Sequence, residues 1–393
     1  MKSEWTYRPL GELVSFASGG TPSKKRDDYW GGTIPWISAK TLKTENIDTS
    51  DLFITEEGLK AGSKIAPKGS ILLLTRGSGL FNGIPIARVE KDVAFNQDIK
   101  CLDSYGEVEN EFIFYWLLSQ KDYLMAKVGV TGIGAGKFDL DFLQKLMIPI
   151  PSERERKSIV GFASSISEKI RCNAKVNDNL YAQVKAIFSE NFLDLDFLPD
   201  GWKTGNLLDI ADYLNGLAMQ KYRPKDGETG LPVLKIKELR QGICDASSEL
   251  CSPSIKSEYI IHDGDIIFSW SGSLLVDIWC GGTCGLNQHL FKVTSNNYDK
   301  WFYYLWTAHH LDRFIAVAAD KATTMGHIKR EELEKVEVII PSKYDYKRIG
   351  ASIKPLFDLI ISNRIEDRKL TALRNTLLPK IMSGEIDVRD IQL

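Results

Sequence analysis

Short glycine-containing segments of this chain carry basic and polar side chains of the types that contact nucleic acid. In the major groove of DNA, Arg pairs with guanine, Asn and Gln pair with adenine, and Ser or Thr bonds to several bases. Lys, Arg and the backbone N–H groups of glycine-rich turns hold phosphates. Arg76 is the strongest single candidate, because it stands between an apolar, strand-like run and the turn Gly77-Ser78-Gly79. The plain alternative at each such position is a solvated turn.

Candidate contact residues of this kind occur in both halves of the chain. In the first half they are Gly20, Thr21, Lys24, Lys40, Arg76, Ser78 and Lys137. In the second half they are Gln220, Lys221, Tyr222, Lys237, Ser271, Ser273, Lys321, Thr324 and His327. Lys24 taken alone is better explained as a solvated side chain. The pair Asn96-Gln97 recurs as Asn287-Gln288, and a repeated pair suits a structural hydrogen-bonding role as readily as a base contact.

Motifs that would make the chain an enzyme are incomplete. Adenine methyltransferases carry an Asp/Asn-Pro-Pro-aromatic tetrapeptide, and this sequence has no Pro-Pro pair. A phosphate-binding loop begins with Gly and has Ser or Thr after its Lys, whereas residues 131–138 begin with Thr131 and place Phe138 after Lys137. The glycines between 77 and 83 have the wrong spacing for a dinucleotide fingerprint. We therefore predict a binding protein that is not itself an enzyme and takes no cofactor.

A zinc site is conceivable at Cys280 and Cys284 with His262 or His289. Structural zinc sites use four ligands, commonly in two closely spaced pairs. No second Cys pair stands at ligand spacing, and residues 279–285 are rich in glycine. We predict no metal.

Composition places the chain among ordinary globular proteins. It has 393 residues, of which 43% are hydrophobic and 26% charged, and this length suggests two to three domains. The longest apolar runs, such as residues 71–74, fall far short of the ~20 residues that a membrane-spanning helix needs. Six cysteines and an N-terminus unlike a signal peptide predict a cytoplasmic protein with reduced thiols. A net charge of −2 argues against indiscriminate coating of nucleic acid, but not against local basic patches.

The elements that must position the candidate residues are duplicated along the chain. Residues 5–13 are echoed by residues 202–210, at an offset of 197, and residues 69–73 by residues 264–268, at an offset of 195. The segment 146–152, which ends in Ile-Pro-Ile-Pro-Ser, is matched by 336–342, at an offset of 190. The order is kept over essentially the whole chain, so we predict two copies of one structural unit.

Each copy has a strand-rich part followed by a long helix. In the first copy, residues 69–75, 84–89 and 93–102 are expected to be strands and residues 110–127 a helix. Ser152 and Glu155 form a capping box at the start of the first long helix, and Ser342 with Asp345 repeats it more weakly.

A heptad pattern predicts that the two long helices form a coiled coil. The seam positions of the first helix are Ile159, Ile166, Asn173, Leu180 and Ile187, with Ala163, Ile170, Asn177 and Val184. Those of the second are Ile349, Leu356, Asn363, Leu370 and Leu377, with Ile353, Ile360, Asp367 and Arg374. The alternative is two amphipathic helices, each packed on its own domain.

Polar seam residues suggest an antiparallel register. Setting Asn173 opposite Asn363 brings polar residues together at the centre, with Asn177 and Asp367 nearby, and leaves apolar residues facing at both ends. Buried seam Asn residues fix register at a cost in stability. Pro355 should kink or restart the second helix, and Pro379 should bend or end its last turn.

The sequence resembles the specificity subunits of type I restriction–modification systems over nearly its whole length. The resemblance is carried by Ser18-Gly19-Gly20-Thr21-Pro22, by Tyr-Trp-Gly-Gly-Thr-Ile-Pro-Trp at residues 29–36, by Phe95-Asn96-Gln97 and by the segments at 148–152 and 377–386. The second copy departs from the pattern, with Asn215-Gly216-Leu217-Ala218 in place of Gly-Gly-Thr-Pro. Residue roles that the resemblance implies for the first domain are therefore not transferred position by position to the second domain.

The resemblance implies a bipartite double-stranded DNA target, with one half read by each domain. It also implies methyltransferase subunits docked on the helices and a motor/endonuclease subunit as partners, which would hold the methyl donor and ATP. Different half-sites for the two domains are consistent with the low identity between the copies.

We therefore predict an α+β fold with two mixed, mainly β recognition domains and two long helices in an antiparallel coiled coil, related by a pseudo-two-fold axis. The predicted boundaries are 1–150 for the first recognition domain, 151–192 for the central helix, 193–340 for the second recognition domain, and 341–393 for the last helix and tail. The predicted function is sequence-specific DNA recognition. The rivals are a pseudo-symmetric protein scaffold that never touches DNA and an enzyme with an unrecognised site.

Overall fold

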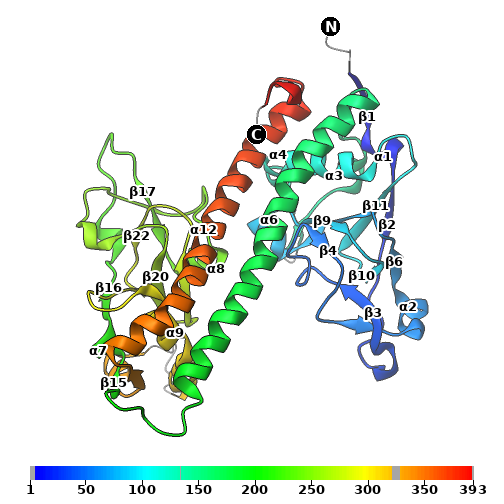
Figure 1. Cartoon of the computed structure of the whole chain (residues 1–393). Coiled ribbons are helices and arrows are strands. Elements are labelled where there is room, and N and C mark those ends of the chain that lie inside the picture. The colour runs from blue at the N-terminus through cyan, green and yellow to red at the C-terminus, as the bar shows by residue number, and fades with distance from the viewer. Residues whose placement is uncertain (1–4, 133, 321–327, 392–393) are drawn as a thin grey trace. The chain divides into compact units, whose positions relative to one another are not determined.

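The computed structural model describes residues 5–132, 134–320 and 328–391, and Figure 1 shows its elements. The chain forms two compact units, one made of Met1–Glu168 with Thr371–Leu393 and the other of Lys169–Leu370. Each unit therefore contains one strand-rich part and portions of both long helices. Three candidate residues, Lys321, Thr324 and His327, lie outside the described residues.

Two sheets dominate the first unit. The larger has the order β2 (Val14–Ser18), β11 (Ile99–Ser104), β7 (Ile71–Leu74), β9 (Ile86–Val89), β4 (Asn46–Ile47). The other has the order β5 (Phe53–Ile54), β3 (Trp30–Ile37), β10 (Val93–Phe95), β6 (Lys64–Ala66). Strand β7 is fully buried, as expected for a continuous apolar run with no polar face.

Smaller elements complete the first unit. Strand β1 (Thr6–Pro9) pairs with β14 (Met147–Ile150), and β12 (Gly129–Val130), β13 (Gly136–Lys137) and β8 (Arg76–Gly77) form a three-stranded sheet. The short helices are α1 (Leu10–Leu13), α2 (Glu56–Gly62), α3 (Asn110–Ser119), α4 (Lys121–Met125) and α5 (Leu140–Gln144), with 3-10 turns at Asp27–Tyr29, Ser78–Asn82 and Val388–Asp390. The helix expected over 110–127 is thus two helices, which meet at Gln120.

The second unit repeats this strand order. Its larger sheet is β16 (Asp212–Asn215), β23 (Leu290–Thr294), β20 (Asp265–Ser269), β21 (Leu275–Trp279). Its other sheets are β18 (Leu250–Cys251), β17 (Leu231–Leu234), β22 (Cys284–Leu286), β19 (Ile260–Ile261) and the pair β15 (Lys203–Asn206), β24 (Glu337–Ile340). The parallel pair β3–β10 has its counterpart in β17–β22, so the duplication seen in the sequence is a duplication of topology.

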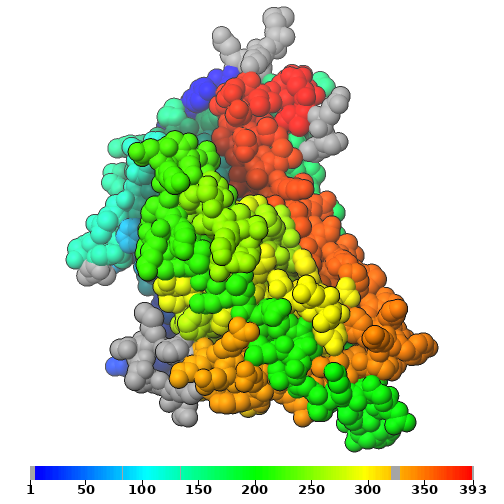
Figure 2. Space-filling view, turned by 90° about the vertical axis from the view of Figure 1, so that its left-hand side faces the viewer, coloured from blue at the N-terminus to red at the C-terminus, as the bar shows by residue number. Residues whose placement is uncertain are grey.

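The short helices of the second unit are α7 (Leu207–Ile210), α8 (Ile236–Gln241), α9 (Lys300–His309), α10 (Leu311–Asp320) and α11 (Glu331–Glu334). A π-helical turn covers Ser189–Leu193, and 3-10 turns cover Met219–Lys221 and Ser257–Tyr259. A largely aromatic core joins α9 to the long helices, with Phe192, Trp301 and Phe302 almost fully buried. Figure 2 shows the surface of this unit in green to orange.

The predicted strand over residues 93–102 is divided, and so is the matching segment of the second copy. The run 93–102 is split into β10 and β11, which belong to different sheets. Asn96 causes the break, because its side chain accepts from the backbone N–H of Asp98 and its carbonyl accepts from Ile99. Asn287 makes the matching turn through the N–H groups of His289 and Leu290. The repeated Asn is therefore a buried structural residue.

The long helices are α6 (Glu153–Phe188) and α12 (Lys343–Met382), drawn in green and in orange to red in Figure 1. The capping box of α6 is present: the Ser152 N–H donates to Glu155 Oε2 at 3.0 Å, and the Glu155 N–H donates to Ser152 Oγ at 3.4 Å. Asp345 donates its N–H to Ser342 Oγ at 3.2 Å in the same way at α12. Among the described residues, no helix is long and apolar enough to cross a membrane.

Pro355 and Pro379 do not interrupt α12. The helix runs through both, so the expected restart at Pro355 is wrong. Both prolines are exposed, and the carbonyl left without an N–H partner by Pro355 is that of Ala351, whose residue is also exposed. Water can bond to such a carbonyl, so the missing helical hydrogen bond is tolerated on this face.

The helices pair antiparallel within the second unit through a polar layer. Asn173 donates to Asp367 Oδ1 at 2.7 Å and to Glu366 Oε2 at 2.8 Å, and Asn363 donates to Asn177 Oδ1 at 2.9 Å. The four polar seam residues therefore meet, but Asn173 faces Asp367 and not Asn363. The observed pairs differ from the predicted pair by about one helical turn. The heptad pattern identifies the residues of the seam, but it does not determine which polar residue of one helix lies opposite which polar residue of the other.

Candidate nucleic-acid interface

Arg76 and Lys137 lie side by side on two short strands of the first unit. Strand β8 pairs antiparallel with β13, and these two residues are direct partners in the register. The strands are anchored by the buried side chains of Phe138 and Leu80 and by the bond from the Phe138 N–H to the Thr75 carbonyl at 2.9 Å. Two segments that are 60 residues apart in the sequence thus present two cations together.

This arrangement of like charges is suited to an anion. Both side chains are exposed, and neither has an ion pair with any residue that the structure describes. Like charges directly opposite each other on paired strands destabilise a sheet. A phosphate or an electronegative base edge between them removes that cost. Ser78 follows in the adjacent turn and is also exposed.

The glycine-rich segment near residue 20 has a structural role in addition to any contact with a ligand. The Gly20 N–H donates to the Phe95 carbonyl at 2.9 Å, and a Cβ at this position would lie 2.0 Å from the Gly62 carbonyl oxygen. Thr21 Oγ1 donates to Gln97 at 2.7 Å. Lys24 and Lys40 are exposed, so of the candidates in these loops they are the ones free to reach a phosphate.

The counterpart of the Arg76 loop in the second unit is built differently. The Ile328 N–H donates to the Trp270 carbonyl at 2.9 Å, which matches the bond between Phe138 and Thr75. Ser271, at the position equivalent to Arg76, is only 5% exposed, and its hydroxyl pairs with His289 Nδ1 at 3.0 Å. Ser273 is half-buried, and its carbonyl accepts from Ser269. The hydroxyl of Ser271 therefore already has an internal partner, and a contact between Ser271 and DNA stays a prediction.

A basic pocket in the second unit gathers several other candidates. Its volume is about 410 Å³, and its lining includes Lys221, Tyr222, Arg223, Lys225, Ser252, Ser254, Lys256 and Tyr259. Gln220 lies in the same 3-10 turn as Lys221 and is exposed. Lys221 and Lys256 form no ion pair with any residue in the described part of the chain. Unpaired cations suit the phosphates of a polynucleotide.

The residues predicted from the sequence do not include Lys225, Lys256, Ser252, Ser254 or Tyr259 of this pocket. The lysines and serines belong to two segments some 30 residues apart, and only the fold brings them to one pocket. Glu228 organises the pocket by accepting from the Lys225 N–H at 3.0 Å and from Ser252 Oγ at 2.8 Å. These bonds hold the pKa of the Glu228 carboxyl below its ordinary value. In the sequence, the positive charge of this region was the one indication that these residues could lie at a binding site.

Lys237 is partly neutralised within its own unit. Its Nζ donates to Ser247 Oγ at 2.9 Å and lies 3.9 Å from a carboxylate oxygen of Asp245. Exposed pairs of this kind are weak, so the side chain can exchange partners.

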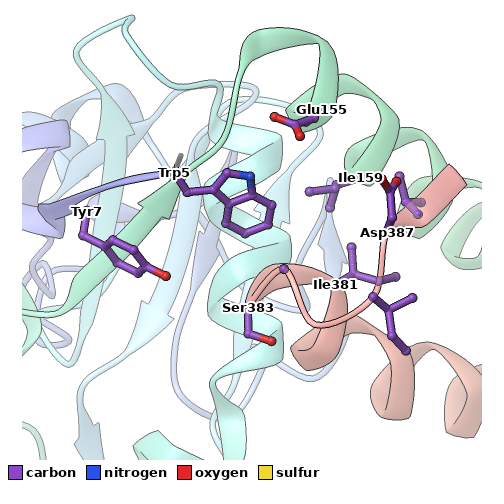
Figure 3. Close-up of a pocket in the computed structure, with 10 residues that line it drawn as sticks. Trp5, Tyr7, Glu155, Ile159, Ile381, Ser383 and Asp387 are labelled. Atoms are coloured by element: carbon purple, nitrogen blue, oxygen red, sulfur yellow. The ribbon is translucent and has the colours of Figure 1, made fainter. Parts of the chain in front are cut away.

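A second pocket, in the first unit, has a different chemistry. Its volume is about 520 Å³, and Figure 3 shows Trp5, Glu155, Ile159 and Ile381 around it. Aromatic and aliphatic side chains and two carboxylates line it, without Lys or Arg among the described residues. A lining of this kind does not attract phosphate, so we separate it from the nucleic-acid interface.

Comparison with known proteins identifies the family. Residues 2–182 and 199–372 match the type I restriction modification DNA specificity domain. The MjaIX specificity subunit of Methanocaldococcus jannaschii is 26% identical, with 99% of this chain and 95% of that protein aligned. The HindI specificity subunit of Haemophilus influenzae is 20% identical over 70% of this chain and 77% of that protein.

The same fold occurs in a solved structure. A type I restriction–modification S subunit from M. genitalium aligns with a TM-score of 0.56 over 96% of both chains, at 17% sequence identity. This agreement supports the duplicated α+β architecture described above. Because the family match covers both copies and most of the sequence, the chain belongs to the type I restriction–modification DNA specificity domain family.

Proposed function

We propose that this chain recognises a bipartite double-stranded DNA site and directs methyltransferase and endonuclease subunits to it. Each strand-rich part reads one half-site, and the bases between the half-sites are not read. The half-sites then lie roughly one helical turn apart, about 34–36 Å, as in other two-part DNA binders. The chain contributes recognition, and the chemistry belongs to its partner subunits.

The directly opposed Arg76 and Lys137 carry this proposal. An Arg fork can make two bonds to the O6 and N7 of guanine, whereas a Lys ammonium suits a phosphate as a point charge. Side by side, the two side chains can contact one base edge and the flanking backbone. In the second domain, the basic pocket around Lys221 and Lys256 supplies backbone contacts. A net charge of −2 makes binding depend on these local clusters and not on overall attraction.

The test is DNA binding by the full chain, alone and together with methyltransferase subunits. We expect selection from a random-sequence duplex pool to yield two constant half-sites at a constant separation. The variant Arg76→Ala/Lys137→Ala should bind more weakly and select the first half-site less strictly, with the selection of the second half-site unchanged. A chain that shifts no duplex in a mobility assay, yet still assembles with its partner subunits, would support the scaffold alternative. Methyl transfer by this chain alone would show it to be an enzyme.

A further inference from the structure

Arg374 is a charged residue at a position where the heptad pattern of α12 favours an apolar one. It follows Ile353, Ile360 and Asp367 at intervals of seven residues, and it is only 4% exposed. Its guanidinium donates to both carboxylate oxygens of Glu45, at 2.6 and 2.8 Å, and to Ser167 Oγ of α6, at 2.9 Å. Burial of such a charge is tolerated only when its donors are satisfied.

Glu45 fixes this contact to the first recognition domain. The residue directly precedes β4, and its backbone carbonyl accepts from the Arg88 N–H of β9 at 2.9 Å. Burial acts to raise the pKa of the Glu45 carboxyl, but Arg374 and then Lys121 hold that pKa below its ordinary value. The carboxylate is therefore ionised at neutral pH, and both bonds to Arg374 are formed.

Two further arginines of α12 hold the second recognition domain in the same manner. Arg364 donates to both oxygens of Asp277 in β21, at 2.8 and 2.9 Å. Arg368 donates to both oxygens of Asp263, which lies between β19 and β20, at 3.1 and 2.7 Å. The Gly282 N–H also donates to Asp263 at 2.8 Å, so this carboxylate is oriented by its own domain.

Bidentate ion pairs of this type restrict the angle between the two elements that they join, whereas apolar contacts do not. A guanidinium and a carboxylate must be coplanar and aligned for both bonds to form. Apolar contact is non-directional and permits sliding. The repeat offers a comparison, because the residue 190 positions before Arg374 is Val184, which is fully buried in the second unit. An apolar residue therefore suffices for packing at this place in the repeat, and the ion pair of Arg374 adds direction.

We propose that the arginines of α12 are positioning residues that set the orientation of each recognition domain, and thereby the separation of the two half-sites. Arg374 acts on the first domain, and Arg364 with Arg368 on the second. This inference rests on the proposed function, since it concerns the geometry with which a bipartite site is read. None of the three need touch DNA.

The test measures the separation of half-sites independently of their sequence. The double variant Arg374→Met/Glu45→Gln removes the two charges of the pair together, and Lys121, which also pairs with Glu45, is exposed enough to remain solvated, so the fold should persist. The full chain, reconstituted with methyltransferase subunits, is used to select duplexes from a random pool. We expect the preference for the optimal spacer over a spacer longer or shorter by one base pair to fall at least fivefold, with both half-site sequences unchanged. Arg364→Met/Asp277→Asn should have the same effect.

The matched control is Lys157→Met/Glu153→Gln, which removes an exposed pair at 2.6 Å on α6 and should leave spacer preference unchanged. If the double variant fails to fold, Arg374→Lys retains the charge without the fork and should still broaden the spacer preference. A folded Arg374 variant with the wild-type preference would overturn the inference, as would a changed half-site sequence. A wild-type chain that selects no two-part site would overturn the proposed function as well.

Discussion

At the scale of single residues, Arg76 and Lys137 are expected to contribute differently to DNA binding. Arg76→Ala should cost about 1–3 kcal/mol at the preferred site and relax the choice of one base in the first half-site. Lys137→Ala should weaken binding to all sequences evenly and lower the salt dependence by about one ion. Binding titrations at several salt concentrations, on preferred and altered sites, measure both effects.

The control for these substitutions is Lys91→Ala, since Lys91 is an exposed cation in the turn before β10. It should change neither affinity nor selectivity. If Arg76→Ala also leaves both unchanged, Arg76 is a solvated turn residue and the proposed reading of the first half-site is wrong.

The contacts of the candidate residues with DNA stay predictions, but the sequence was sufficient to predict part of their surroundings. The exposed Lys and Arg residues of glycine-containing turns could be identified, and the pairing of Arg76 with Lys137 joins two of the predicted loops. Ser271 could not be evaluated, because its partner His289 lies on a different segment. Lys256 was missed for the same reason, since the pocket that contains it is formed by tertiary contacts.

At the scale of elements, the uninterrupted course of α12 through Pro355 makes a stability prediction. Pro in the interior of a helix costs about 3 kcal/mol relative to Ala, offset in part by the restricted unfolded chain. Pro355→Ala should therefore raise the free energy of unfolding by about 2 kcal/mol, as measured by denaturant titration. Ser352→Ala, on the same exposed face, should change it by less than about 0.5 kcal/mol. A loss of stability in Pro355→Ala would contradict a continuous helix at this point.

Asp367 and Glu366, in the polar layer between the two long helices, are predicted to have opposite effects on how stability depends on pH. Burial raises the pKa of Asp367, against the hydrogen bond from Asn173, so ionised Asp367 destabilises the native state. Asp367→Asn should increase stability at neutral pH, and the gain should shrink as the pH falls through the raised pKa, where the native carboxyl becomes neutral.

Glu366 provides the matched comparison in the same layer. Hydrogen bonds from Asn173 and then Lys169 lower the pKa of Glu366, so its carboxylate stabilises the native state. Glu366→Gln should reduce stability at neutral pH, and the loss should shrink as the pH falls through the lowered pKa. Thermal unfolding from pH 7 to pH 3 measures both variants. Shifts of the same sign for the two variants would contradict this account of the layer.

Heptad spacing and capping residues were sufficient to predict both long helices, and the polar seam residues were sufficient to predict their antiparallel direction. The polar residues that face each other differ from the predicted pair by one helical turn. Each helix has polar residues in two successive layers, and the heptad pattern alone does not determine which layers face each other. Pro355 was predicted to kink or restart the second long helix because proline is unfavourable inside a helix. The exposed position of Pro355 allows the helix to continue. The strand run 93–102 was divided by the turn at Asn96, which a period-two pattern does not reveal.

At the scale of the whole molecule, the duplication was the feature most accessible from the sequence. Offsets of 190 to 197 residues correspond to the repeated sheet order of the two units. The predicted domain limits at residues 150, 192 and 340 remain predictions, because the compact units assign parts of each long helix to different units. Sequence periodicity marks where elements begin, whereas compactness depends on which elements pack together.

The central claim is that each strand-rich part reads one half of a two-part DNA site. The most direct measurement is selection from a random duplex pool by the full chain with methyltransferase subunits, before and after residues 1–150 are replaced by the equivalent domain of a relative. This account predicts that the exchange alters one half-site and leaves the other half-site intact. Alteration of both half-sites by the exchange, or the absence of any enriched two-part sequence with the unmodified chain, would contradict it.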